Sequence, residues 1–434
     1  MKRIEIIDSL RGIAIITMLL FHTSYYWDSQ LDVASYNNYL HNPLAMIALI
    51  FGKFAGIFAI ITGMAYTYSV FYKREHANRS IRSMLETTLT AGIMVVIISK
   101  IHVAVFNHTH TGDPIHPYPT GPKYYTLLTG SIETGIFQIP NKFTLLYRST
   151  ALLMIGICII WTGALLAILL RKDGIAYFRR NLIITFLIGT TIILSTQFLK
   201  NSLRPVWISF ILNDQTLPAF LLGIFIGDPF PFFPFAGYST YGMIFGMAFY
   251  ENIPSRTVTS ASLLFGGAYL GTGIYLYIVH GYARISKIYE TPELQLNLIQ
   301  IGMMIIFSMI IYDIHYMNET NPIRRAFLST GIRRFGLLTL TIFMLEPLLG
   351  TSIKVFVLDP LFGMWSRNIG LAACYGISLI GLWSIILTYW ERYNFIGSWE
   401  WLNSRLFQKI TNQQTMRIDI KKNLYVTQEI RLQE

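Results

Sequence analysis

Long apolar segments recur along the whole chain, separated by short polar connections. A helix needs about 20 mainly apolar residues to cross the ~30 Å hydrocarbon core of a bilayer. About ten segments meet that description, with ends uncertain by about 2–4 residues. They cover residues 10–28, 44–71, 82–106, 144–170, 181–199, 232–250, 258–282, 295–316, 334–357 and 369–390. The pattern predicts an all-α fold, a polytopic membrane helix bundle with about ten transmembrane helices.

Two stretches depart from the simple pattern. An apolar piece at 217–226 is too short to span, so it is expected to be re-entrant or interfacial. At 227–235, three prolines within six positions interrupt the helical hydrogen-bond ladder, so no regular helix is expected there. The next span carries Gly237, Gly242 and Gly246, and an earlier one carries Thr62-Gly63. Such small residues predict closely packed helix pairs.

The distribution of charge predicts how the chain is oriented in the membrane. The chain has 434 residues, of which 53% are hydrophobic and 13% charged, with a net charge of +11. The basic residues cluster in alternate loops, whereas loop 24–43 contains no Lys or Arg. This asymmetry predicts a cell-membrane protein with both termini cytoplasmic and gives no reason to expect a nucleic-acid partner. Two cysteines within hydrophobic segments indicate neither a disulfide framework nor a thiolate metal site.

The chain is expected to divide at its last span. No small-residue cleavage site follows the first apolar segment, so that segment reads as a retained helix. Residues 1–392 then form the transmembrane domain, and 393–434 form a cytoplasmic amphipathic and basic tail. The apolar side of the tail helix would comprise Trp399, Trp401, Leu402, Leu406, Phe407 and Ile410.

The first span carries two ionisable residues, Arg11 and His22. Eleven positions at about 100° per residue bring both to one stripe of a helix, roughly 16 Å apart along its axis. Ionisable residues inside a membrane are costly and are by default candidates for function. Asp8, one turn before Arg11, is placed to pair with it. The structural alternative is that Arg11 snorkels to a lipid headgroup while His22 bonds a neighbouring helix.

A second basic pair opens the third span. Arg79 and Arg82 share a helix face, with Glu86 one turn beyond Arg82. Beside Arg11 at the same membrane surface they would form an anion cradle. The simpler alternative is the positive-inside charge of any cytoplasmic loop.

The long exterior loop after this span carries a different set of side chains. His108, His110, Asp113 and His116 could ligate zinc, but their spacing follows no fixed pattern, so no metal is predicted. Its Pro, Gly and Tyr residues, Tyr124 among them, suit a lid or a sugar-stacking surface. His102 approaches the same end of the membrane, and it joins Tyr124 and Glu346 as a candidate substrate contact.

Several of these motifs resemble one family. Arg11 and His22, with ten residues between them, resemble the first-helix motif of the transmembrane acyltransferase superfamily. That superfamily includes the acyltransferase-3 proteins and the heparan-alpha-glucosaminide N-acetyltransferase catalytic-domain family. Four further stretches resemble the N-acetyltransferase family: Asp8–Ala14, Thr62-Gly63, Phe230–Gly237, which is similar to its proline run, and Arg334–Pro347, which is similar to its late segment. Arg79-Ser80-Ile81-Arg82 resembles acyltransferase-3 proteins. The departures are Phe343 for a common tyrosine, and Glu346 and Tyr147 for common histidines.

The resemblance implies transfer of an acyl group, most simply acetyl, from acyl-CoA to a hydroxyl or amine of a glycan or glycolipid. His22 would be the base, helped by Arg11 and Asp8, and Arg11, Arg79 and Arg82 would hold the donor. The expected partners are the bilayer, acyl-CoA and the acceptor, with a homo-oligomer left open. The alternatives are a secondary transporter with a path through His22, Glu86, Asp313 and Glu346, or a scaffold. No internal duplication supports a transporter.

The charge asymmetry makes a direct prediction of topology. A single cysteine at Ser35 or Thr111 should react with a membrane-impermeant thiol reagent added outside intact cells, and one at Asn78 should react only after permeabilisation. The opposite pattern of labelling would reverse the orientation.

Overall fold

The chain folds into a bundle of helices. A computed structural model describes residues 5–23, 26, 55–76, 80–108, 126–171, 174–227, 229–280, 294–411 and 424, and these contain no strand. The long helices are α1 (Glu5–His22), α4 (Gly56–His76), α5 (Ile81–Ile101), α7 (Ala151–Leu169), α8 (Phe178–Leu212), α10 (Phe232–Tyr250), α11 (Ser255–His280), α12 (Leu294–Tyr316), α15 (Thr339–Ile353) and α17 (Ile369–Glu391). The predicted all-α fold class is confirmed.

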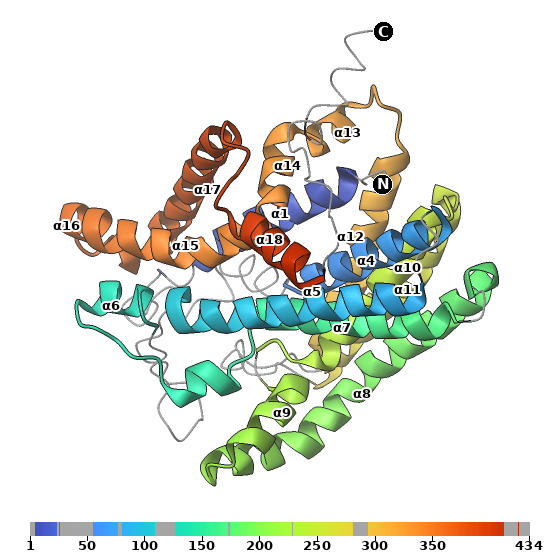
Figure 1. Cartoon of the computed structure of the whole chain (residues 1–434), viewed down its shortest axis with the longest axis horizontal. Coiled ribbons are helices and arrows are strands. Elements are labelled where there is room, and N and C mark those ends of the chain that lie inside the picture. The colour runs from blue at the N-terminus through green and yellow to red at the C-terminus, as the bar shows by residue number, and fades with distance from the viewer. Residues whose placement is uncertain are drawn as a thin grey trace.

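Shorter helices connect or extend these. They are the α-helices α6 (Thr129–Thr134), α9 (Thr216–Ile226), α13 (Pro322–Phe327), α14 (Thr330–Leu337), α16 (Asp359–Phe362) and α18 (Trp399–Thr411), the π-helices η3 (His102–Phe106), η4 (Phe143–Tyr147) and η7 (Lys354–Leu358), and the 3₁₀-helices η5 (Gly174–Tyr177) and η8 (Trp365–Arg367). Figure 1 shows α4, α5, α7 and α10 across the middle, α8 and α9 below them, and α14, α15 and α17 above.

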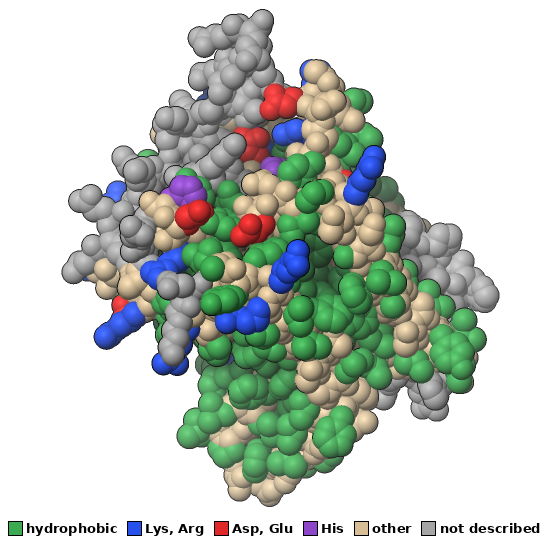
Figure 2. Space-filling view, turned by 90° about the vertical axis from the view of Figure 1, so that its right-hand side faces the viewer, with side chains coloured by type: hydrophobic (Ala, Val, Ile, Leu, Met, Phe, Trp, Pro, Cys, Tyr) green, Lys and Arg blue, Asp and Glu red, His purple; other side chains and the backbone are tan. Residues whose placement is uncertain are grey.

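Each expected span contains a helix, but the spans differ in character. Seven helical segments among the described residues are long and apolar enough to cross a membrane. The other three expected spans are α1, α4 and α10, which pack against other helices in the core. Exposed apolar side chains gather instead on α8 and α11, as at Phe198 and Ile278. Figure 2 shows a broad hydrophobic area on one face, with basic side chains along its border, as expected for a surface that meets lipid.

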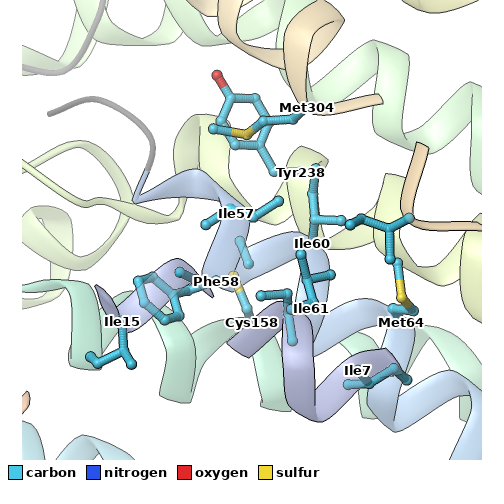
Figure 3. Close-up of a cluster of buried hydrophobic side chains, with 14 of the residues drawn as sticks. Ile7, Ile15, Ile57, Phe58, Ile60, Ile61, Met64, Cys158, Tyr238 and Met304 are labelled. Carbon is cyan, nitrogen blue, oxygen red and sulfur yellow. The ribbon is translucent and has the colours of Figure 1, made fainter. Parts of the chain in front are cut away.

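Helix α4 is the centre of the core. Figure 3 shows its Ile57, Phe58, Ile60, Ile61 and Met64 among side chains from α1, α7, α10 and α12. Its Gly63 lies directly against α10, where an added Cβ would stand 1.9 Å from the carbonyl oxygen of Ser239. On α10, Gly242 makes the matching approach, 2.0 Å from the carbonyl oxygen of Ile60. The predicted close packing of these small residues is confirmed.

The first helix is held in the same way. An added Cβ on Gly12 would lie 2.0 Å from the carbonyl oxygen of Ile332, and one on Gly336 would lie 1.8 Å from that of Asp8. Glycines on α1 and α14 therefore allow backbone contact between the two helices. This contact fixes the position of α1, which carries both Arg11 and His22.

The end predicted for the span at 181–199 is wrong. The span expected at 181–199 continues as α8 to Leu212, past Lys200 and Pro205, because Trp207 is buried and donates a hydrogen bond of 3.0 Å to the Ala219 carbonyl oxygen on α9. Loss of hydropathy ended the predicted span, whereas a tertiary contact maintains the helix. The expected break in the proline run is confirmed, since α10 starts only at Phe232 and Phe233 is non-helical.

The span expected at 334–357 is interrupted at Leu338, which separates α14 from α15. The N-terminus of α15 is capped from the tail, because the Glu400 carboxylate accepts hydrogen bonds from the amides of Leu340 (2.6 Å) and Thr341 (3.1 Å). The tail expected from 393 therefore begins inside the bundle, where Phe395 is also buried. Helix α18 confirms the predicted tail helix, and its position at a membrane surface stays a prediction.

The glycine contacts predict a sharp difference between two equal substitutions. Gly63→Ala forces α4 and α10 apart, so the free energy of unfolding should fall by about 1–3 kcal/mol. Gly271→Ala on α11 meets no atom within 4 Å and should be neutral or raise it by about 0.5–1 kcal/mol. Denaturant titration in detergent micelles compares the two. Equal effects would contradict the close helix contact.

Candidate active site

Three ionisable side chains that are distant in sequence meet at the end of α1. His22 is the last residue of α1, His108 follows η3, and Glu346 lies within α15. Glu346 Oε2 lies 2.6 Å from His22 Nδ1 and 3.0 Å from His108 Nε2. The other oxygen, Oε1, accepts a hydrogen bond of 3.1 Å from the Tyr26 hydroxyl. One buried carboxylate thus accepts hydrogen bonds from three side chains.

This arrangement fixes the protonation of the two imidazoles. A carboxylate has no hydrogen to give, so His22 Nδ1 and His108 Nε2 must both be donors. The 3.4 Å between those two nitrogens is then a contact between donors rather than a hydrogen bond. In neutral His22 the lone pair consequently lies on Nε2. The carboxylate also stabilises the imidazolium that forms when Nε2 takes a proton.

Access distinguishes the members of this group. The side chain of His22 is 19% exposed, whereas those of His108 and Glu346 are 4% and 0% exposed. His22 also ends α1, where the helix dipole favours a positive charge. Among the three, His22 is the residue that a reactant can reach, with Glu346 and His108 behind it.

A fourth histidine lies beside this group. His102 begins η3 and is only 2% exposed. Its ring centroid is 5.0 Å from that of Phe343, whose other neighbour is His22 at 6.1 Å. Neither nitrogen of His102 has a hydrogen-bond partner within the described part of the chain. The predicted substrate contact His102 therefore lies near His22.

The basic residues singled out in the sequence lie elsewhere. Arg11 and Asp8 form the expected ion pair, at 3.8 Å, near the start of α1. Arg82 pairs with Glu86 at 2.9 Å, and its side chain is 89% exposed. Arg79 and Tyr124 lie outside the described residues, as do His110, Asp113 and His116. The roles of Arg11, Arg79 and Arg82 with the donor therefore stay predictions.

The structure shows which side chains surround Glu346. The sequence predicts that Glu346 contacts substrate, and this stays a prediction; both of its carboxylate oxygens are hydrogen-bonded to His22, His108 and Tyr26. Glu346 is therefore placed to orient His22. The sequence predicts neither His108 nor Tyr26 as a partner of Glu346. It indicates His108 only as a zinc candidate within a loop, and no spacing links Tyr26 to a residue 320 positions away.

The same group bears on two alternatives. His22, His108 and Glu346 could hold a metal ion, since their ligand atoms lie within 4.8 Å of one another, which the sequence did not predict. The N···O separations of 2.6 and 3.0 Å are those of charge-assisted hydrogen bonds, which favours the hydrogen-bonded network.

A transporter path would also need Asp313 and Glu86. Asp313 instead accepts hydrogen bonds from Ser255 and Thr259, and Glu86 pairs with exposed Arg82.

Comparison with known proteins bears on the first quarter of the chain. Residues 3–110 match the family model heparan-alpha-glucosaminide N-acetyltransferase, catalytic. The matched region contains Arg11, His22, His102 and His108, and it suggests a membrane acetyltransferase. No curated protein and no solved structure matches the chain. The similarity of Arg79–Arg82 to acyltransferase-3 proteins stays a prediction.

The hydrogen bonds at Glu346 predict a large stability effect. Glu346→Leu leaves three donors without their acceptor, two of which, on His108 and Tyr26, are buried, so the free energy of unfolding should fall by about 3–5 kcal/mol. Glu319→Leu, an exposed carboxylate in a turn, should change it by less than about 0.5 kcal/mol. Denaturant titration in detergent measures both. If a chelator destabilises the unaltered protein as much as Glu346→Leu does, the group holds a metal ion instead.

Proposed function

We propose that this protein is an integral membrane acyltransferase. It moves an acyl group, most simply acetyl, from acyl-CoA to a hydroxyl or amine of a glycan or glycolipid at the cell membrane. The observation that carries the proposal is the hydrogen bond from His22 Nδ1 to Glu346, which directs the lone pair of the more accessible imidazole of this group to Nε2. The family match over residues 3–110 supports the reaction class.

The residues suit the steps of acyl transfer. Nε2 of His22 takes the proton of the acceptor hydroxyl or amine as its oxygen or nitrogen attacks the thioester carbonyl carbon. Glu346 stabilises the positive imidazole ring during this step, and His108 and Tyr26 hold the carboxylate in place. The same proton then passes to the departing CoA sulfur, which restores neutral His22.

The donor is expected to lie along the stripe of α1. Arg11 is eleven residues before His22, about 16 Å along the helix axis. An extended pantetheine arm would bridge this distance, with the phosphates near Arg11, Arg79 and Arg82 at the cytoplasmic side and the thioester at His22. Charge-assisted bonds from these guanidinium groups would position the donor, with Asp8 orienting Arg11 through their ion pair. The acceptor would approach from the exterior side, where the loop bearing Tyr124 is expected.

The proposal predicts separate effects on chemistry and on binding. His22→Ala should lower turnover of labelled acetyl-CoA with a membrane glycolipid extract by about 10²–10⁴-fold, because general-base assistance is lost. His22→Gln should fail equally, because an amide side chain cannot take up the proton. Binding of CoA should stay unchanged in both variants.

Two controls make the outcome decisive. His76→Ala, an exposed histidine on α4, should keep normal turnover. Arg11→Ala should weaken CoA binding as well as turnover. Near-normal acyl transfer by His22→Ala would exclude His22 as the base, and solute flux without thioester consumption would favour a transporter.

A further inference from the structure

The side chain of His102 is a buried polar group that the proposed reaction has not yet used. It is 2% exposed, and both ring nitrogens lack a hydrogen-bond partner among the residues that the structure describes. A buried polar group without a partner costs folding free energy, because its hydrogen bonds to water are lost and not replaced. A histidine kept for packing alone would be expected to bond a neighbouring backbone or side chain. A partner from outside the chain would supply a hydrogen bond that the protein itself does not.

The position of His102 indicates what that partner is. Its ring packs on Phe343, and the ring of His22 packs on the same Phe343. His102 also begins a π-helix that extends α5, a local distortion often found at functional sites. A molecule reacting at His22 therefore lies beside His102.

The chemistry at that point needs a hydrogen-bond donor. When the acceptor attacks the thioester, the two π electrons of the carbonyl move to its oxygen, and a negative charge develops there. Preorganised donors aimed at such an oxygen contribute strongly to rate. A neutral imidazole carries one N–H and can donate it without a change of charge, as a histidine does to a substrate carbonyl in other enzymes.

We propose that His102 donates its N–H to the carbonyl oxygen of the acyl group and stabilises the oxyanion of the tetrahedral intermediate. This rests on the proposed acyl transfer and adds a second catalytic residue to it. The acceptor proton goes to His22 Nε2 as the new C–O or C–N bond forms. The oxyanion then collapses, the C–S bond breaks, and the thiolate takes the proton from His22. His102 gains and loses no proton in the cycle.

A matched pair of substitutions tests this role. Met and Gln have side chains of similar length, but only Gln offers an N–H donor. His102→Met should lower kcat for labelled acetyl-CoA about 10²–10³-fold, whereas His102→Gln should keep at least ten times the turnover of His102→Met. CoA binding should be unchanged in both. The free energy of unfolding should be higher for His102→Met than for His102→Gln, since Met removes the unpartnered polar group and Gln retains one.

Ser308→Ala supplies the control. Ser308 is a buried hydroxyl on α12 that also lacks a partner in the described part of the chain, so its removal should leave kcat unchanged. Equal turnover in His102→Met and His102→Gln would overturn the proposal, as would parallel losses of stability and turnover. Loss of activity in His22→Ala with normal kcat in His102→Met would retain the acyltransferase and reject only the oxyanion role. Normal activity in His22→Ala would reject the acyltransferase site itself.

Discussion

The structure of the candidate site depends on one buried carboxylate. Glu346 is fully enclosed and accepts hydrogen bonds from His22, His108 and Tyr26. A charge in such a place is stable only when it is well hydrogen-bonded, so its three donors must stay in position. His22 and Tyr26 come from the end of α1 and the residues just after it, His108 follows η3, and α15 supplies the acceptor. This one group therefore joins three parts of the chain and also sets the tautomer of His22.

Close backbone contacts supply the rigidity that this group requires. Gly12 and Gly336 let α1 and α14 touch, and Gly63 lets α4 meet α10. Such contacts leave little room for one helix to slide along another, because any larger side chain would strike a carbonyl oxygen. The position of His22 relative to α15 is consequently determined by atoms far from the reacting groups. The small residues of the sequence are as much a part of the site as the ionisable ones.

Local patterns in the sequence predicted the features that depend on local physics. Apolar segments predicted the helices, prolines predicted the late start of α10, and the spacing of Arg11 and His22 placed both on α1. Features that depend on tertiary contact were not predicted. The extension of α8 relies on Trp207, and the break before α15 is capped by Glu400. His108 and Tyr26 were missed because periodicity carries no information about a partner 238 or 320 residues away.

The capped break before α15 has a consequence for how the protein is made. His22 leaves the ribosome 324 residues before its partner Glu346, and Glu400, which caps the helix bearing Glu346, follows later still. During translation, most of the membrane bundle can be inserted while the imidazole of His22 has no carboxylate beside it. Chains released before Glu400 is made would carry His22, His108 and Glu346 and yet lack the cap of the helix that bears Glu346. Termination before Glu400 should therefore weaken the support of the site although every ionisable member of it is present.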